Sequence, residues 1–180
     1  QIQKSIIILS KYDELKTFES FKFKKYAQFT RAIYSGGAVF DFPSSMDKSI
    51  SNKEYIHTIK SIDKKVFSDD RFEYISKAVM KKSSLLFSTT VGYQHTYPLD
   101  KSTIKISPFL MIDEFSSDAE KFIRGLIYHR GLKKLISYIP KNIPSITALY
   151  EKYKFKFDGE YYLMYKNEKP NINIEAIYGI

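Results

Sequence analysis

The chain has 180 residues, of which 43% are hydrophobic and 16% aromatic. These fractions suffice for one packed domain over residues 1–180 and exclude an intrinsically disordered chain. No apolar stretch approaches the roughly 20 residues that cross a bilayer, and the one at residues 6–9 is too short for a signal peptide. The absence of Cys excludes disulfides, thiolate catalysis and Cys-based metal sites. We expect a cytoplasmic protein that is a monomer or a homodimer, with no membrane partner and no metal.

The net charge is +9, and 25 of the 29 basic residues are Lys. Two explanations stay open. An AT-rich coding sequence produces an excess of Lys and Ile without any functional cause. Alternatively, the charge attracts an anionic partner such as a nucleotide cofactor, tRNA or an acidic carrier protein. The low number of Arg residues argues against a reader of base sequence, because such proteins rely on bidentate Arg contacts.

Residues 1–83 predict a short strand followed by helices. Residues 5–9 have the apolar run of a buried strand. Apolar residues at helical spacing between Asp13 and Tyr34 predict a helix that ends at Gly36 or Gly37. Residues 38–42 form an ambiguous short strand, residues 53–67 predict a second helix, and residues 71–81 have no clear pattern.

Residues 84–166 show a sharper alternation of strands and helices, and residues 167–180 read as a tail. Residues 85–91 and 103–112 predict an antiparallel pair of strands around a turn with Pro98 and Asp100. Ser117 and Glu120 have the spacing of a capping box, and Gly131 suits a left-handed helix stop. The remaining segments predict strand 134–139, a helix opened by Asn142 and Pro144, and strands 154–157 and 160–165 as a hairpin around Asp158-Gly159.

Four segments of this half carry a resemblance to a known family. They are Gly131 to Pro140, Asn142 to Ser145, the Leu-Tyr-Glu-Lys run Leu149 to Phe155, and Gly159 to Lys166. Together they resemble the C-terminal half of the GCN5-related N-acetyltransferases (GNATs), in which a strand, an Asn-led helix and a closing pair of strands follow one another. The resemblance implies a mixed α/β fold, with a central twisted mixed sheet flanked by helices.

The resemblance also implies acetyl-CoA or another acyl-CoA as donor and an amine-bearing acceptor. Family members hold the donor pyrophosphate on a Gly-rich loop before a helix, where backbone N–H groups face the phosphates. Residues 113–120 stand in that place, contain no Gly, and carry four carboxylates. The chain therefore departs from the family pattern at this loop, since those charges repel a pyrophosphate.

Several residues match positions of the family site. Tyr150 matches the general acid that protonates the leaving thiolate, and His95 and Glu114 are candidate bases for the amine. Donor-binding positions correspond to Ser116, Ser117, Asn142, Ser145 and Tyr153. Structural explanations stay open: Tyr150 as a core residue, Asn142 as a helix N-cap, His95 as a residue of a surface turn, and Glu114 as a solvated carboxylate.

Three functions remain in view. The first is acyl transfer from acyl-CoA to an amine, by direct attack on the thioester. The resemblance implies that backbone N–H groups near the splayed strands of the sheet polarise the thioester carbonyl. The second keeps the fold but takes the acyl group from an acyl carrier protein or an aminoacyl-tRNA. The third is a catalytically inert binding or regulatory domain that has lost acyl-CoA binding.

Overall fold

The computed structural model describes residues 5–37, 53–79, 81, 83–113 and 117–180. Within these ranges the helices are η1 (Tyr12–Glu14), α1 (Leu15–Ser20), α2 (Lys53–Phe67), α3 (Phe72–Val79), α4 (Asp118–Arg130), α5 (Pro144–Lys152) and η2 (Ile174–Ala176). The strands are β1 (Ile6–Lys11), β2 (Lys24–Tyr34), β3 (Leu85–Ser88), β4 (Gly92–Pro98), β5 (Thr103–Met111), β6 (Lys134–Pro140), β7 (Lys156–Lys166) and β8 (Ile177–Gly179).

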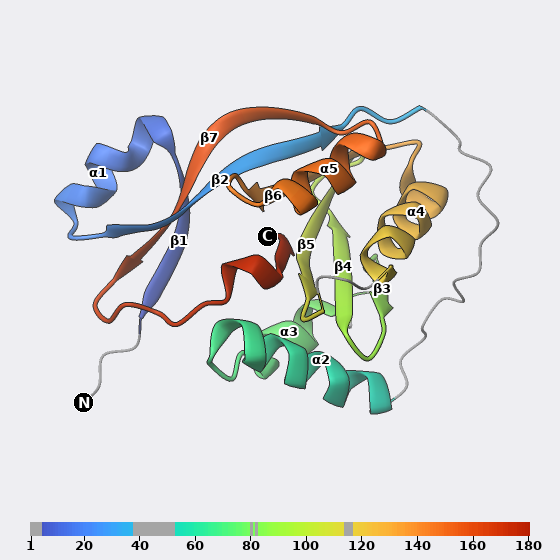
Figure 1. The fold of residues 1–180 in the computed structure, drawn as a ribbon, viewed down its shortest axis with the longest axis horizontal. Helices are drawn as coiled ribbons and strands as arrows, with labels where there is room; N and C mark the ends of the chain where they lie inside the picture. The colour runs from blue at the N-terminus through green and yellow to red at the C-terminus, as the bar shows by residue number, and fades with distance from the viewer. Residues whose placement is uncertain (1–4, 38–52, 80, 82, 114–116) are drawn as a thin grey trace.

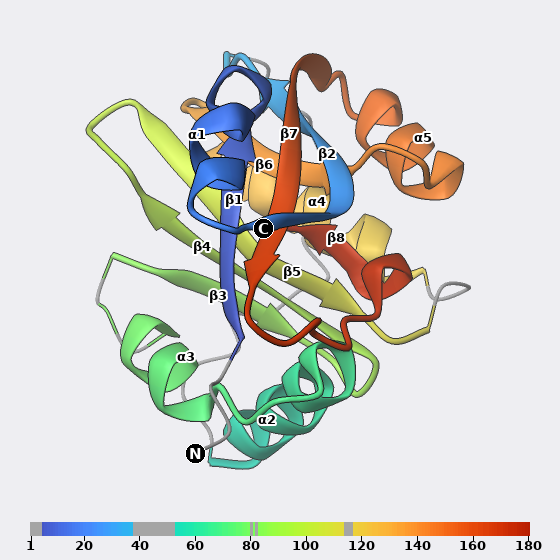
Figure 2. The ribbon, with the colours of Figure 1, turned by 90° about the vertical axis from the view of Figure 1, so that its left-hand side faces the viewer.

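All eight of these strands form one mixed sheet in the order β1-β7-β2-β6-β5-β4-β3, with β8 paired to β5. The β5–β6 pair is parallel and the other pairs are antiparallel. Helices α2 and α3 lie on one face of the sheet, and α4 and α5 lie on the other (Figures 1 and 2). This confirms the expected mixed sheet flanked by helices.

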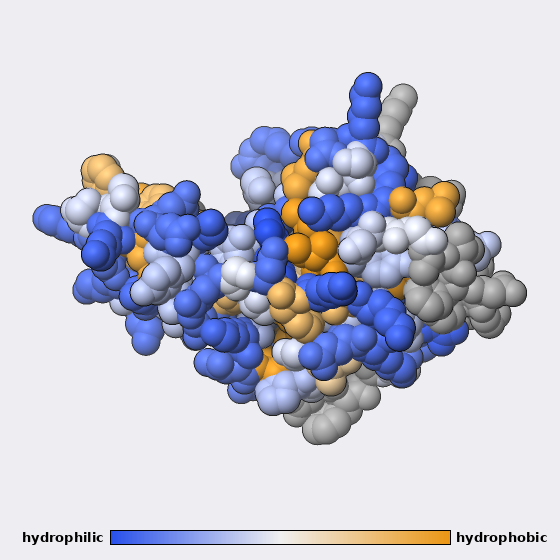
Figure 3. Space-filling view, turned by 90° about the horizontal axis from the view of Figure 1, so that it is seen from above, coloured by the Kyte–Doolittle hydropathy of each residue, from blue (hydrophilic) through white to orange (hydrophobic). Residues whose placement is uncertain are grey.

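Strands β1, β2 and β7 extend into an arm that carries α1 at its end (Figure 1). Seen from above, this arm projects from the body of the molecule and most of its surface is hydrophilic (Figure 3). Strands β1 and β2 therefore belong to the same sheet as the segments that carry the family resemblance.

The helix predicted from Asp13 to Tyr34 is wrong beyond its first turns. Helix α1 ends at Ser20, Lys22 adopts a left-handed φ of 67°, and β2 begins at Lys24. Strand β2 is paired on both sides, by β6 and β7, so two ladders of backbone hydrogen bonds override the helical spacing. The helix predicted at residues 53–67 is confirmed as α2, and the segment without a clear pattern contains α3. The strand considered at residues 38–42 lies outside the described residues.

The strand pairing predicted around Pro98 is only partly correct. Residues 85–91 divide into β3 and a turn, and it is β4 that pairs with β5 around residues 99–102. Asp100 stabilises that turn by accepting hydrogen bonds from the backbone N–H groups of Ser102 and Thr103. The predicted strand 85–91 thus combined one strand with a connection, because its apolar run continues through the turn.

Three cap predictions and one hairpin prediction are wrong. Gly131 has an ordinary φ of −66°, not a left-handed one, and Ser117 makes no side-chain capping bond. The N-cap of α5 is Ile143 rather than Asn142, although Pro144 does open the helix. Residues 156–166 form one strand, in which Gly159 (φ 68°) marks an added residue opposite β2. The closing pair of strands thus consists of β7 and β2, which come from opposite ends of the sequence.

Candidate functional site

Strands β5 and β6 part shortly after they pair. Their parallel ladder covers only Thr103–Lys105 against Lys134–Ile136. At the next step, the Ser137 hydroxyl donates a hydrogen bond of 3.1 Å to the Ile106 carbonyl. Beyond this point the two strands leave a gap in the sheet, which is the place where the family resemblance puts the reacting thioester.

Strand β8 fills this gap. It pairs with β5 through Phe109 opposite Gly179 and Leu110 opposite Ile177. On the other side, Ile180 and Tyr138 of β6 exchange two backbone hydrogen bonds of 3.1 and 3.0 Å. The end of the chain therefore lies in the middle of the sheet (Figure 1), where β5, β8 and β6 are connected by backbone hydrogen bonds.

The side chains of β8 belong to both hydrophobic cores. Ile177 is fully buried on the face covered by α2 and α3, and Tyr178 packs in the core beneath α4 and α5. The Tyr178 and Phe109 rings lie 5.3 Å apart. Gly179 passes so close to Ser137 that an added Cβ would overlap its hydroxyl. Strand β8 is thus an integral part of the packing.

Tyr150 reaches β8 from α5. Its side chain is fully buried, and its hydroxyl donates a hydrogen bond of 2.8 Å to the Tyr178 carbonyl. Burial raises the pKa of Tyr150 well above its ordinary value, and only a contact with Ser137 opposes this shift. The hydroxyl therefore stays protonated, as a general acid requires, but it already donates its hydrogen to the Tyr178 carbonyl.

The start of α4 carries paired carboxylates. Asp118 forms an ion pair of 2.8 Å with Lys121. Glu120 does not form the predicted capping box; it accepts hydrogen bonds from Lys152 (2.8 Å) and from the Tyr153 hydroxyl (2.6 Å). The hydrogen bond from Lys152 is the main reason that the pKa of Glu120 is lowered. The pKa of Tyr153 is raised mainly by burial and secondly by its hydrogen bond to Glu120. The helix start is thus occupied by a local ionic network.

The other predicted donor-binding residues are spread along the loops. Ser117 directly precedes α4, and both Asn142 and Ser145 are exposed at the start of α5. Glu114 and Ser116 lie outside the described residues. The structure therefore brings Tyr150 to the gap and Tyr153 to the start of α4, and it does not gather those predicted residues that it describes into one pocket.

The described residues do not fit acyl-CoA in the family manner. The gap that would hold the thioester arm contains β8, and the start of α4 presents carboxylates where phosphates would need N–H groups. Within the described ranges, no group of three His, Asp or Glu side chains could hold a metal ion.

His95 lies in a different place from the predicted site residues. It is in the interior of β4 and only 1% exposed, so its interpretation as a residue of a surface turn is wrong. It lines a cavity of about 370 Å³ between α3 and the sheet. Burial is the main effect on His95 and lowers its pKa. Hydrogen bonds to the backbone of Ser107 and Ala78 act in the opposite direction, and the charge of Lys81 lowers the pKa slightly further.

Beside this cavity lies a buried ionic cluster that the sequence predictions missed. Asp63 is 1% exposed and accepts two hydrogen bonds from Arg71, of 2.9 and 2.7 Å, and one of 2.8 Å from the Tyr93 hydroxyl. The sequence did contain a signal for this cluster, because Asp63 lies on the apolar face of α2 among the buried Ile59, Ile62 and Val66. A carboxylate on such a face requires a partner.

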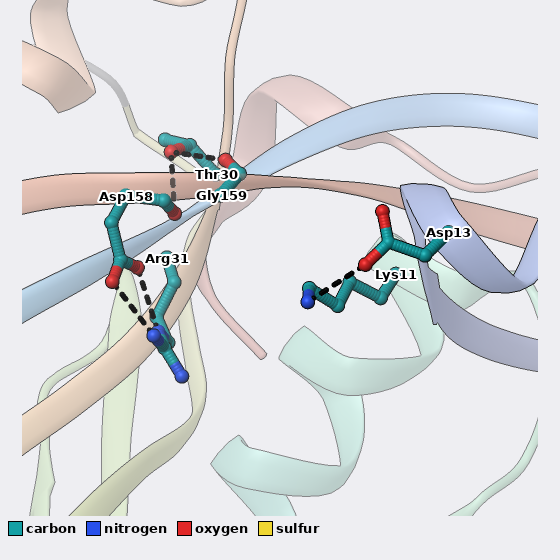
Figure 4. A network of polar contacts seen from close by, with 6 residues as sticks. All are labelled: Lys11, Asp13, Thr30, Arg31, Asp158 and Gly159. Carbon is teal, nitrogen blue, oxygen red and sulfur yellow. Dashed lines mark hydrogen bonds and ion pairs between the residues drawn. The ribbon is translucent and has the colours of Figure 1, made fainter.

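A second polar network joins β2 to β7 (Figure 4). Arg31 of β2 forms a bidentate pair with Asp158 of β7, with bonds of 2.8 and 2.7 Å, while Thr30 donates to the Asp158 and Gly159 carbonyls. These contacts link the two strands around the bulge at Gly159. Lys11 and Asp13 form a separate ion pair of 2.9 Å at the junction of β1 and η1.

No protein-family model and no curated protein sequence matches the chain. Solved structures do. A proposed acetyltransferase from Pyrococcus horikoshii aligns over 98% of this chain and 58% of its own, with a TM-score of 0.74 and 20% identity. A GCN5-related N-acetyltransferase from Sphaerobacter thermophilus aligns over 97% of this chain and 63% of its own, with a TM-score of 0.59 and 14% identity. An acetyltransferase of the GNAT family from Colwellia psychrerythraea aligns over 92% and 65%, with a TM-score of 0.57 and 10% identity.

The chain thus spans about three fifths of the length of the first two of these proteins. No helix in the described part of the chain is long and apolar enough to cross a membrane. The similarity covers nearly the whole chain, including most of residues 1–83, for which the sequence alone indicated no family. The chain has the fold of the GCN5-related N-acetyltransferases.

Proposed function

We propose that the chain is a domain with the acyltransferase fold that does not itself hold acyl-CoA and that acts as a binding or regulatory domain. The observation that carries this proposal is the position of β8. It pairs with β5, exchanges hydrogen bonds with β6, and accepts the hydrogen bond of Tyr150. The groups that would receive a thioester are therefore satisfied by the chain itself.

The cost of opening the gap supports this proposal. Displacing β8 would expose Ile177 and Tyr178, which are 0% and 5% exposed, and full burial of such a side chain stabilises a protein by about 1.5–3 kcal/mol. For a ligand that binds only the open form, the apparent affinity is reduced in proportion to the fraction of molecules in which the gap is open. Since about 1.4 kcal/mol corresponds to a factor of ten, acyl-CoA would bind at least about 100-fold more weakly than it does to an open gap.

The second candidate is acyl transfer by this domain, from acyl-CoA, an acyl carrier protein or an aminoacyl-tRNA to an amine. The fold favours it, as does the Tyr150 hydroxyl at the point where β5 and β6 part. In this case β8 would have to leave the gap during each cycle. The two candidates therefore differ in whether the gap opens under native conditions.

Calorimetric titration with acetyl-CoA, together with thermal unfolding, distinguishes them. A ligand at 100 times its dissociation constant adds about 2.7 kcal/mol to the free energy of unfolding. We expect no heat of binding, no stabilisation and no acyl transfer to a panel of amines. Saturable binding by the parent chain, with turnover, would instead establish the second candidate. A chain lacking residues 177–180 tests whether β8 alone excludes the donor.

A further inference from the structure

The cavity beside His95 lies next to the gap filled by β8, and Ile180 is among the residues that line it. It has a volume of about 370 Å³ and is bounded by α3, by β1 and by one face of β4 and β5. Most of the residues around it are apolar, and no carboxylate side chain is among them. A space of this size and character holds a small molecule with an apolar body.

Lys105 gives the cavity a positive charge. Tyr97 and Lys105 are directly opposite each other on β4 and β5, so their side chains share the sheet face that lines the cavity. The Lys105 ammonium lies 5.2 Å from the centre of the Tyr138 ring. Burial alone lowers its pKa, and no described carboxylate acts on it. Arg71 also lines the cavity, but its charge is balanced by Asp63.

His95 lies beside Lys105 in the lining. The His95 ring stacks on Tyr97 with 5.7 Å between ring centres, which places it on the same sheet face as Lys105. Its Nδ1 lies 2.8 Å from the Ser107 carbonyl, so Nδ1 carries a hydrogen and donates it. Nε2 is then an acceptor, and no hydrogen-bond donor for it is found among the described residues. A carboxylate only accepts hydrogen bonds, so Lys105 and not His95 gives the cavity its preference for a negative charge.

We propose that this cavity binds a small monocarboxylate with an apolar body, whose carboxylate lies against Lys105. The apolar residues of α3 and β1 would cover the body of the ligand. A cationic amine is disfavoured because no carboxylate side chain among the described lining residues would balance its charge next to Lys105. The cavity borders the gap through Ile180, but the proposal does not rest on the proposed function, since it requires neither Tyr150 nor the presence or absence of acyl-CoA in the gap.

Calorimetric titration with octanoate, 3-phenylpropionate and octylamine tests the charge preference. We expect at least one of the two carboxylates to bind with one-to-one stoichiometry, at least about tenfold more tightly than octylamine. The NMR resonances of the His95 ring should shift during this titration. Failure of both carboxylates to bind at millimolar concentration, or binding of octylamine with equal affinity, would overturn the proposal.

Lys105→Met tests the role of the charge, because Met preserves the apolar stem that packs in the cavity. We expect this variant to lose the preference for carboxylates over octylamine. Lys16→Met is the matched control: it removes the same charge from the exposed surface of α1 and should bind as the parent does. Lys105→Gln provides a second variant if Lys105→Met does not fold. An unchanged preference in a folded Lys105 variant, or an equal loss in Lys16→Met, would refute the assignment.

Discussion

The hydroxyl of Tyr150 donates a hydrogen bond of 2.8 Å to the backbone carbonyl of Tyr178, and both groups are buried. This contact joins α5 to β8 at the point where β5 and β6 separate. The tyrosine that the family resemblance identifies as a general acid therefore holds the strand that closes the gap. The same residue can be tested for a structural role and for a catalytic one.

Tyr150→Phe should lower the free energy of unfolding by about 1–3 kcal/mol, because the buried Tyr178 carbonyl loses its donor. Urea denaturation measures this change. Tyr128→Phe is the control, since Tyr128 is 50% exposed and its hydroxyl should contribute little to stability. If the domain is an active transferase, loss of a general acid would instead lower turnover by about 10²-fold. Unchanged stability would show that the hydrogen bond to β8 is not maintained in solution.

Gly179→Ala should destabilise the protein through the contact with Ser137, because the new Cβ overlaps the Ser137 hydroxyl. Ser137→Ala removes that hydroxyl, at the cost of its bond to the Ile106 carbonyl. In a double-mutant cycle the two changes should couple by about 1 kcal/mol or more, with the double variant more stable than the sum predicts. Additive effects would mean that β8 does not lie against β6.

Stability should fall with decreasing pH through the ordinary range of histidine, because burial lowers the pKa of His95 in the folded state. Well above pH 6.5 His95 is neutral in both states and contributes no pH dependence. As the pH falls below about 6.5, the unfolded chain takes up the proton first and the folded state loses relative stability. Measuring the His95 ring resonance against pH should give a pKa below 6.5. A value at or above 6.5 would contradict the buried position of the ring.

Asp63→Asn should lower the free energy of unfolding by about 2–3 kcal/mol, because it removes the buried charge that balances Arg71. Tyr93→Phe removes only one hydrogen bond to the same carboxylate and should cost about 1 kcal/mol. Chemical denaturation of both variants gives the comparison. Equal losses would show that the charge of Asp63 contributes nothing beyond its hydrogen bonds.

Gly159→Ala should lower the free energy of unfolding more than Asp158→Asn does, although the ion pair of Asp158 is the more conspicuous feature (Figure 4). Gly159 has a φ of 68°, and an added Cβ would lie 2.8 Å from the Tyr161 ring; a left-handed residue other than Gly costs about 1–2 kcal/mol. The Asp158 side chain is 47% exposed, so loss of its pair should cost at most about 1 kcal/mol and less at high salt. The reverse order of stabilities in urea would be inconsistent with a bulge at Gly159.

Local patterns in the sequence were sufficient for the elements whose burial follows from their own residues. Helices α2, α4 and α5 and strands β5 and β6 lie close to their predicted positions, because each carries an apolar face or run of the correct period. The Leu-Tyr-Glu-Lys segment and the segments around it indicated the acyltransferase fold. The acidic character of the segment before α4 was also evident from the sequence, since it depends on residue identity alone.

Only the tertiary structure decided which segments meet in the sheet. The pattern of β2 was compatible with a helix, and it became a strand because β6 and β7 both pair with it. Residues 177–180 read as a tail, yet they enter the gap because Ile177 and Tyr178 bury their side chains in the two cores. Position 179 lies so close to Ser137 that it has room only for a glycine. Contacts between residues more than 100 positions apart, such as the pairing of β2 with β7, leave no periodic signal in a single sequence. The placement of the last strand against Tyr150, and with it the closed state of the site, therefore depends on packing that only the folded chain reveals.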